Sequence, residues 1–256
     1  MSIPNRTSQL SMTALQGFPL VEDGDDVGSL IIEGILANKF PVQDDLIIVI
    51  AQKIVSKAEG RAVRLDSVTP GKDALALAKK SGKDARLVQL ILSESKTIIR
   101  QSGNRIITEN NLGIIMANAG IDQSNIDDGY ALLLPENPDD SATRIGRKIG
   151  AALGLDVGIV IADSAGRPWR KGVVGLAIGV YGIPAVLDIR GSVDLNGREL
   201  LATEVGVADS IAAAAALLMG QGNEGNPVVL LSGLAYERSS SSASDILRDK
   251  DSDLFR

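Results

Sequence analysis

The sequence predicts a fold of interspersed helices and strands whose main sheet is not purely parallel. Short apolar runs, such as residues 45–51, are typical of fully buried strands, and runs with helical spacing, such as residues 84–95, lie between them. Residues 105–118 have the pattern of a β-hairpin, which joins antiparallel strands. With 256 residues, 45% of them hydrophobic, the chain is long enough to bury a sizeable core in one or two domains.

The composition excludes several classes of site and partner. The chain has no cysteine and no histidine, so disulfides, zinc sites of Cys or His, and Ser-His-Asp or Cys-His catalysis are ruled out. Any metal must bind oxygen atoms, which suits Mg²⁺, Mn²⁺ or Ca²⁺. The formal net charge of −6 argues against a general nucleic-acid partner. No apolar run reaches the roughly 18 residues of a membrane span, and no signal peptide is recognisable, so we expect a cytoplasmic protein with no membrane partner.

The N-terminal part predicts a helix whose start is acidic. Asp25 or Asp26 is expected to cap a helix over residues 30–36. Because acidic side chains are favourable at that end of a helix, we interpret residues 22–26 as a solvated helix start and not as a metal site.

The buried strand at residues 45–51 leads directly into a polar segment. Gln52, Lys53 and Lys57 follow the strand and could bind phosphate groups. Alternatively, residues 53–57 form a second, exposed strand in which polar and apolar side chains alternate. Both readings remain open at this point.

The middle of the chain predicts two helices, a hairpin and a polar loop. The helices cover residues 70–80 and 84–95, with Gly82 ending the first. The hairpin turns at Asn110 and Asn111. In the loop at residues 118–125, the short polar side chains either bind their own turn backbone, which we favour, or offer Asp122 to a cation and Asn125 to a ligand.

Residues 158–172 carry the most concentrated chemistry. A helix at residues 142–153, capped by Asp140 or Ser141 and ended by Gly154, precedes them. A strand at residues 159–162 then leads to Asp163 and Ser164, a turn is expected at Ala165 and Gly166, and three cations surround the only tryptophan, Trp169. A carboxylate just past a buried strand could hold a hard cation, and the cations Arg167, Arg170 and Lys171 could hold phosphate or carboxylate groups. The alternative is a surface turn with a solvated basic patch.

The last third predicts two more strands, a long helix and a glycine loop. The strands cover residues 172–181 and 185–189, and the helix covers residues 198–219, about 30 Å long. Residues 220–225 match G-x-G-x-x-G, but they lie between a helix and a strand, the reverse of the dinucleotide-binding order. The loop therefore either binds an anion through backbone N–H groups or simply connects two elements. Residues 239–256 read as a solvated Ser-rich tail with a short terminal helix over residues 245–256.

In their order along the chain, these segments resemble the coenzyme F420:L-glutamate ligase family. The resemblance rests on residues 17–26, 51–61, 118–125, 133–135, 163–170, 194–200, 207–209 and 219–225, and so covers nearly the whole chain. Ser164 stands where the family more often has Thr, which keeps the hydroxyl. Gln221 stands where the family can have Glu, and a neutral amide there lowers the charge of the site.

The resemblance implies an α+β fold with mixed sheets and flanking helices, two intertwined subdomains and an intertwined homodimer. Residues 1–238 would form the γ-glutamyl ligase domain, and residues 239–256 the tail. The implied activity is a GTP-dependent ligation of the deazaflavin coenzyme F420 precursor to L-glutamate, followed by further γ-linked glutamate. It would use an acyl phosphate and release GDP and phosphate. The alternatives are a divalent-metal-dependent nucleotide phosphohydrolase or a non-catalytic nucleotide-binding protein.

The resemblance also implies site residues and ions. The implied ions are two divalent cations, Mg²⁺ or Mn²⁺, with K⁺ as a further ion, and GTP is the co-substrate. The metal ligands would be Asp122, Asp163, Ser164 and Gln221. The GTP-binding residues would be Phe18, Pro19, Leu20, Val21, Gln52, Lys53, Lys57, Asn125, Met219, Gly220, Gln221, Gly222, Asn223, Glu224, Gly225 and Asn226. Lys57, Arg167 and Arg170 are candidates for binding anionic groups in catalysis, which needs no protein nucleophile.

Overall fold

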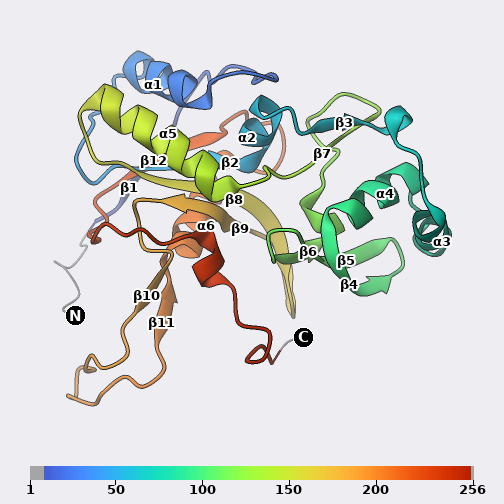
Figure 1. Cartoon of the computed structure of the whole chain (residues 1–256). Helices are drawn as coiled ribbons and strands as arrows, with labels where there is room; N and C mark the ends of the chain where they lie inside the picture. The colour runs from blue at the N-terminus through green and yellow to red at the C-terminus, as the bar shows by residue number, and fades with distance from the viewer. Residues whose placement is uncertain (1–8, 255–256) are drawn as a thin grey trace.

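A five-stranded mixed sheet forms the centre of the molecule, which is described over residues 9–254 by a computed structural model (Figure 1). In spatial order the strands are β1 (Ser11–Ala14), β12 (Val228–Ser232), β2 (Ile47–Ala51), β8 (Gly158–Arg167) and β9 (Arg170–Tyr181). Strands β2 and β8 run parallel, and the other neighbouring pairs are antiparallel. The predicted α+β class with mixed sheets is therefore confirmed.

Helices cover both faces of this sheet because its central strands are apolar on both sides. On strand β2, Ile48 and Ile50 face the core shared with α1 (Val27–Ala37), α2 (Gln52–Ala58) and α5 (Pro138–Leu153). Ile47 and Val49 face the opposite core, which contains α6 (Val207–Met219). All four side chains are fully buried. This alternation confirms the predicted buried strand.

A smaller subdomain with its own apolar core lies to one side of the sheet (Figure 1). It contains α3 (Lys72–Ser81), α4 (Ala85–Ser93), the sheet β4 (Ser95–Ser102), β5 (Arg105–Asn110) and β6 (Ile115–Ala117), the pair β3 (Ala62–Arg64) and β7 (Tyr130–Leu132), and the 3-10 turns Leu65–Ser67 and Asn118–Gly120. The two predicted helices, the left-handed end at Gly82 and the hairpin are confirmed. Strand β4 was not predicted. Intertwined subdomains and a homodimer remain predictions.

The helix predicted over residues 198–219 is wrong in its first half. Strands β10 (Val186–Asp188) and β11 (Glu204–Gly206) pair antiparallel and form an arm that extends away from the sheet (Figure 1). The helix α6 begins only at Val207. The Asp194 carboxylate accepts the N–H groups of Asn196 and Arg198, which stabilises a turn that ends where the helix was expected to begin.

One helix start was predicted well and the other was not. Asp26 is the N-cap of α1 and accepts the N–H of Ser29, as expected. Helix α5 is capped by Asn137, whose side chain accepts the N–H of Asp140, so the predicted Asp140 or Ser141 cap is wrong. Pro138 follows the cap because its missing N–H costs nothing in the first turn.

Two further local predictions are corrected. Residues 53–57 belong to helix α2, not to an exposed strand, and bury Ile54 and Val55 in the main core. Strand β8 continues through Ala165 and Gly166 to Arg167, and the chain reverses at residues 168–169. The turn was expected too early because small residues also fit inside a hairpin ladder.

The C-terminal tail is packed rather than a solvated linker. Ala243 in the 3-10 turn Ala243–Ile246 is buried, and its N–H donates to the Asp139 carboxylate. The Lys250 Nζ atom lies 3.0 Å from the Glu109 carboxylate. In place of the predicted terminal helix, the described part of the tail contains only the 3-10 turn Ala243–Ile246. Residues 255–256 of the tail and residues 1–8 of the predicted ligase domain lie outside the described residues. The division at residue 238 remains a prediction. Among the described helices, none has the length and apolar character needed to cross a bilayer.

Candidate functional site

The parallel strands β2 and β8 end side by side and start the site. Ala51 lies opposite Ala162, so the next residues, Gln52 and Asp163, are adjacent. Gln52 is buried, its Oε1 atom accepts the Ser56 hydroxyl at 2.8 Å, and its side chain hydrogen-bonds the Asp163 carboxylate. The carboxyl ends of parallel strands are a common place for ligand chemistry.

Asp122 reaches this point from the smaller subdomain. Two backbone hydrogen bonds with Leu132, of 3.1 and 2.8 Å, hold Asp122 against the end of β7. Its carboxylate lies 2.6 Å from the Lys53 Nζ atom and accepts both the N–H and the hydroxyl of Ser124, at 2.8 and 2.9 Å. The bond from the Ser124 N–H confirms the favoured prediction that short polar side chains in residues 118–125 bind their own turn backbone. The contact between the Ser124 hydroxyl and Asp122 was not predicted.

The two aspartates have opposite pKa shifts. Burial raises the pKa of Asp163 to about 6, and the nearby Asp122 carboxylate adds to this effect. The Ser164 N–H, Gln52 and Lys53 lower the pKa but do not outweigh burial. At Asp122, burial alone would raise the pKa, but the bonds from Lys53 and Ser124 outweigh it and the pKa is lowered. The mutual repulsion means that the fold brings the two carboxylates into electrostatic reach of each other.

The glycine loop after α6 approaches the same place. The Gln221 Nε2 atom donates to the Ser164 hydroxyl at 2.9 Å, and the Asn125 Nδ2 atom donates to the Gly222 carbonyl at 3.3 Å. The Glu224 carboxylate accepts the Gly222 N–H at 2.8 Å and folds back over Gly220, where a Cβ would lie 2.1 Å from it. The Glu224 side chain could move away, but the φ of 75° and ψ of −174° at residue 220 form a backbone conformation that only glycine adopts readily.

The N-terminal segment adjoins this loop. Gln16 donates to the Asn226 side chain at 3.3 Å, and Asn226 donates to the Leu218 carbonyl at 3.2 Å. Just beyond, Phe18 packs on the main core while Leu20 is 89% exposed. The predicted nucleotide-binding residues thus come from neighbouring segments, namely residues 18–21, the start of α2, Asn125, and residues 219–226.

Three predicted cations are less closely connected to the aspartates. Lys57 lies one turn beyond Lys53 on α2. Arg167 lies four residues beyond Asp163 on β8, about 13 Å farther along an extended strand, and Arg170 follows the turn. The two arginines therefore belong to the hairpin tip and not to the aspartate cluster.

The residues present fit a hard divalent cation. Two carboxylates, the Ser164 hydroxyl and the Gln221 amide are all potential oxygen donors, as Mg²⁺ or Mn²⁺ prefers. Within residues 9–254, no cluster of three or more Asp, Glu, His or Cys side chains is suited to a metal ion. Hydroxyl, amide and phosphate oxygens would therefore complete the coordination. Turning the Gln221 amide would present its oxygen in place of its nitrogen.

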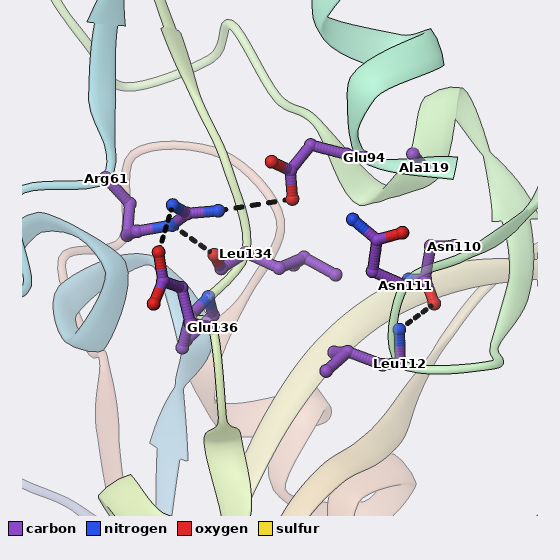
Figure 2. A pocket seen from close by; sticks show the side chains of 9 residues that line it. Arg61, Glu94, Asn110, Asn111, Leu112, Ala119, Leu134 and Glu136 are labelled. Carbon is purple, nitrogen blue, oxygen red and sulfur yellow. Dashed lines mark hydrogen bonds and ion pairs between the residues drawn. The ribbon is translucent and has the colours of Figure 1, made fainter. Parts of the chain in front are cut away.

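A polar cavity of about 210 Å³ lies away from these residues and is lined by Arg61, Glu94, Ala119, residues 110–112 and residues 134–136 (Figure 2). Arg61 crosses it, donating to the Leu134 carbonyl at 2.8 Å and pairing with Glu94 and Glu136, each at 3.1 Å. Because the two acids already outnumber the one cation, the cavity is poorly suited to an anion. Arg61 instead joins the segment after α2 to Glu94, at the end of α4, and to residues 134–136.

The comparisons with known proteins agree with one another. The family model for F420-0:Gamma-glutamyl ligase matches residues 17–233. The chain belongs to the F420-0:gamma-glutamyl ligase family. It is 45% identical over 249 residues to the coenzyme F420:L-glutamate ligase of Methanothermobacter thermautotrophicus. The aligned residues cover 96% of this chain and 99% of that relative. The ligase of the same name from Methanocaldococcus jannaschii is 47% identical over 221 residues, covering 86% of this chain and 88% of that relative. The Methanopyrus kandleri ligase is 43% identical over 240 residues, covering 92% of this chain and 93% of that relative. The family predicted from the motifs is confirmed.

Proposed function

We propose that this chain is a GTP-dependent ligase that joins the carboxylate of the coenzyme F420 precursor to L-glutamate and then adds further glutamate through γ-linkages. Family membership and the names of the relatives support the ligase activity and its two substrates. One structural observation carries the nucleotide part of the proposal. Asp122 and Asp163, which are far apart in the chain, lie within electrostatic reach of each other, and their neighbours Asn125 and Ser164 bond to a glycine loop of the kind that binds phosphate groups.

The proposed reaction has two steps. A carboxylate oxygen of the precursor attacks the γ-phosphorus of GTP, which forms an acyl phosphate and releases GDP. The glutamate amine then attacks the acyl carbon, loses a proton and displaces inorganic phosphate, which leaves an amide. Neither step needs a protein nucleophile, so catalysis depends on positioning and on neutralising charge.

Each group in the site has a part in this scheme. Asp122, Asp163, Ser164 and Gln221 would hold divalent ions, Mg²⁺ or Mn²⁺, which when bound neutralise phosphate oxygens. The N–H groups of residues 219–226 would orient the phosphates, and Lys53, which is already paired with Asp122, would exchange that carboxylate for a phosphate oxygen. Lys57 would add a second cation on the same helix. GTP over ATP, a K⁺ site and a homodimer belong to the proposal through the family resemblance, and the cytoplasmic location is carried over from the sequence analysis.

Mass spectrometry of the precursor after incubation with glutamate, Mn²⁺ and each nucleotide tests the proposal. We expect products heavier by one and then more glutamyl residues, with GDP formed in step. GTP loss without glutamate and without a new amide would indicate a phosphohydrolase instead, and saturable binding with no phosphate release would indicate a binding protein. In the Asp163→Asn variant, GDP formation is expected to fall at least about a hundredfold. An unchanged rate would contradict the metal role of Asp163.

A further inference from the structure

The tip of the β8–β9 hairpin combines an exposed aromatic ring with concentrated positive charge. Trp169, at the reversal of the hairpin, is 82% exposed. Arg167 precedes it, and Arg170 and Lys171, both exposed, follow it. In a chain with a net charge of −6, three cations within five residues form a distinct local feature. Planar rings with anionic groups are the ligands that this combination recognises best.

Two features of the tip point to a ligand rather than to an ordinary surface turn. Among the described residues, the Arg167 Nη1 atom is buried and has no hydrogen-bond partner, which is costly for a charged donor. Trp169 has a φ of 58°, a left-handed conformation that is an outlier for a bulky residue. The tight reversal at residues 168–169 needs such a conformation, and Gly or Asn would adopt it at lower cost, so a bulky ring at this position points to a use for the ring.

The hairpin also connects the tip to the aspartates. Asp163 and Arg167 lie on the same strand, about 13 Å apart along it. Strand β8 also contacts β6 of the smaller subdomain. A substrate with its carboxylate near Asp163 could therefore place a distant ring at Trp169.

We propose that the hairpin tip is the binding site for the ring of the coenzyme F420 precursor, with the deazaflavin stacked on Trp169 and its phosphate group paired with Arg167 and Arg170. This inference rests on the proposed function, which supplies the substrate, and adds the residues that recognise it. Stacking of a flat ring on an aromatic side chain tolerates small changes in the ring, so flavin mononucleotide is a suitable second probe. The ring, and not the nucleotide, is the ligand of this tip.

The intrinsic fluorescence of Trp169 reports on binding directly, because it is the only tryptophan in the chain. We expect saturable quenching by the precursor and by flavin mononucleotide, and none by ribitol 5-phosphate, which has no ring. N-acetyltryptophanamide, titrated in parallel, corrects for absorption of light by the ring. Quenching equal to that of the free tryptophan analogue would overturn the proposal. So would emission typical of a buried tryptophan, which would place the tip against a second copy of the chain.

Steady-state kinetics separate recognition from chemistry. Trp169→Ala is expected to raise the KM for the precursor about tenfold and to leave the KM for GTP unchanged. Trp169→Phe, which keeps a ring, should restore most of the loss. Leu195→Ala is the matched control, because Leu195 is also an exposed apolar residue at the end of a β-arm, with 100% exposure. An unchanged precursor KM in Trp169→Ala would overturn the proposal.

The two assays also distinguish failure of this inference from failure of the proposed function. Quenching needs no turnover, so saturable quenching without any amide product would reject the ligase and keep the ring site. Amide formation with an unaffected precursor KM in Trp169→Ala would reject the ring site and keep the ligase.

Discussion

The Lys53 Nζ atom lies 2.6 Å from the Asp122 carboxylate and thereby joins helix α2 to the loop that follows the smaller sheet. The same ammonium group acts on Asp163, whose pKa it helps to lower against the effect of burial. One lysine thus stabilises both negative charges of the site when no other cation is bound. A metal ion and this ammonium group compete for the same oxygens.

This competition predicts the effect of removing the lysine charge. In Lys53→Met, Asp122 loses its ion pair, so the protein without nucleotide should bind Mn²⁺ several-fold more tightly, as measured by electron paramagnetic resonance. Binding of GTP should weaken at the same time, because a phosphate partner is lost. Lys57→Met is the matched control and should leave the Mn²⁺ affinity unchanged. A weaker Mn²⁺ affinity in Lys53→Met would contradict the competition.

The raised pKa of Asp163 predicts a pH-dependent stability. Because its pKa is about 6 in the folded protein against an ordinary 3.8, the folded state holds the proton more tightly, so stability falls as the pH rises from about 4 to 6. Asp163→Asn removes this loss. With a chelator present, the variant should exceed the parent by about 3 kcal/mol in unfolding free energy at pH 8, and the difference should vanish near pH 3.5.

Urea unfolding at several pH values measures this difference. Asp188→Asn is a control of opposite sign, because the Arg190 side chain lowers the pKa of Asp188 to about 2. At pH 8 the unfolding free energy of that variant should be slightly lower than that of the parent. A parent protein more stable than Asp163→Asn at pH 8 in the presence of chelator would show that the carboxylate is not penalised by burial.

The elements that were predictable are those whose signals are local. The buried strand β2, the Asp26 cap and the glycine ends of α3 and α5 at Gly82 and Gly154 follow from short-range pattern and capping chemistry. The start of α6 was misplaced because residues 198–205 contain no glycine or proline that would interrupt a helix. The pairing of β11 with β10 decides that the helix begins only at Val207. Tertiary pairing of this kind leaves little trace in a single sequence.

The site was predictable only in part for the same reason. Forty residues separate Asp122 from Asp163, and nothing in either local pattern indicates that they meet. Their pairing was expected from the family resemblance, and the structure places them together through Lys53 and Gln52. The bond from the Ser124 N–H to Asp122 is of the local kind favoured for residues 118–125, but the continuation of β8 beyond Asp163 was missed, because strand length depends on pairing with β9.

Close packing of α6 on the sheet predicts a sensitive glycine. A Cβ at Gly175 on β9 would lie 2.3 Å from the Ala212 carbonyl oxygen of α6, so Gly175→Ala must push the helix away. We expect a loss of about 3 kcal/mol in unfolding free energy. Gly166→Ala, on the paired strand of the same hairpin, is the control, because its added Cβ has no neighbour within 4 Å. Equal denaturation midpoints for the two variants would contradict the close approach of α6.

The packed tail predicts that truncation weakens the main domain. The Asp139 carboxylate, in the first turn of α5, accepts the Val180 N–H of strand β9 at 2.8 Å and the Ala243 N–H of the tail at 3.0 and 3.2 Å. Removing residues 239–256 deletes one of these two donors and exposes the surface that Ala243 covers. The expected loss is about 1–3 kcal/mol in unfolding free energy, measured by urea denaturation.

A chain truncated after Lys250 keeps both Ala243 and the Lys250–Glu109 ion pair and should match the parent. If the two truncated proteins were equally stable, the tail would be dispensable and the domain would end near residue 238, as the sequence predicted. A loss confined to the longer truncation would instead make the tail part of the domain, because the bond from Ala243 to Asp139 holds α5, β9 and the C-terminal segment at one point.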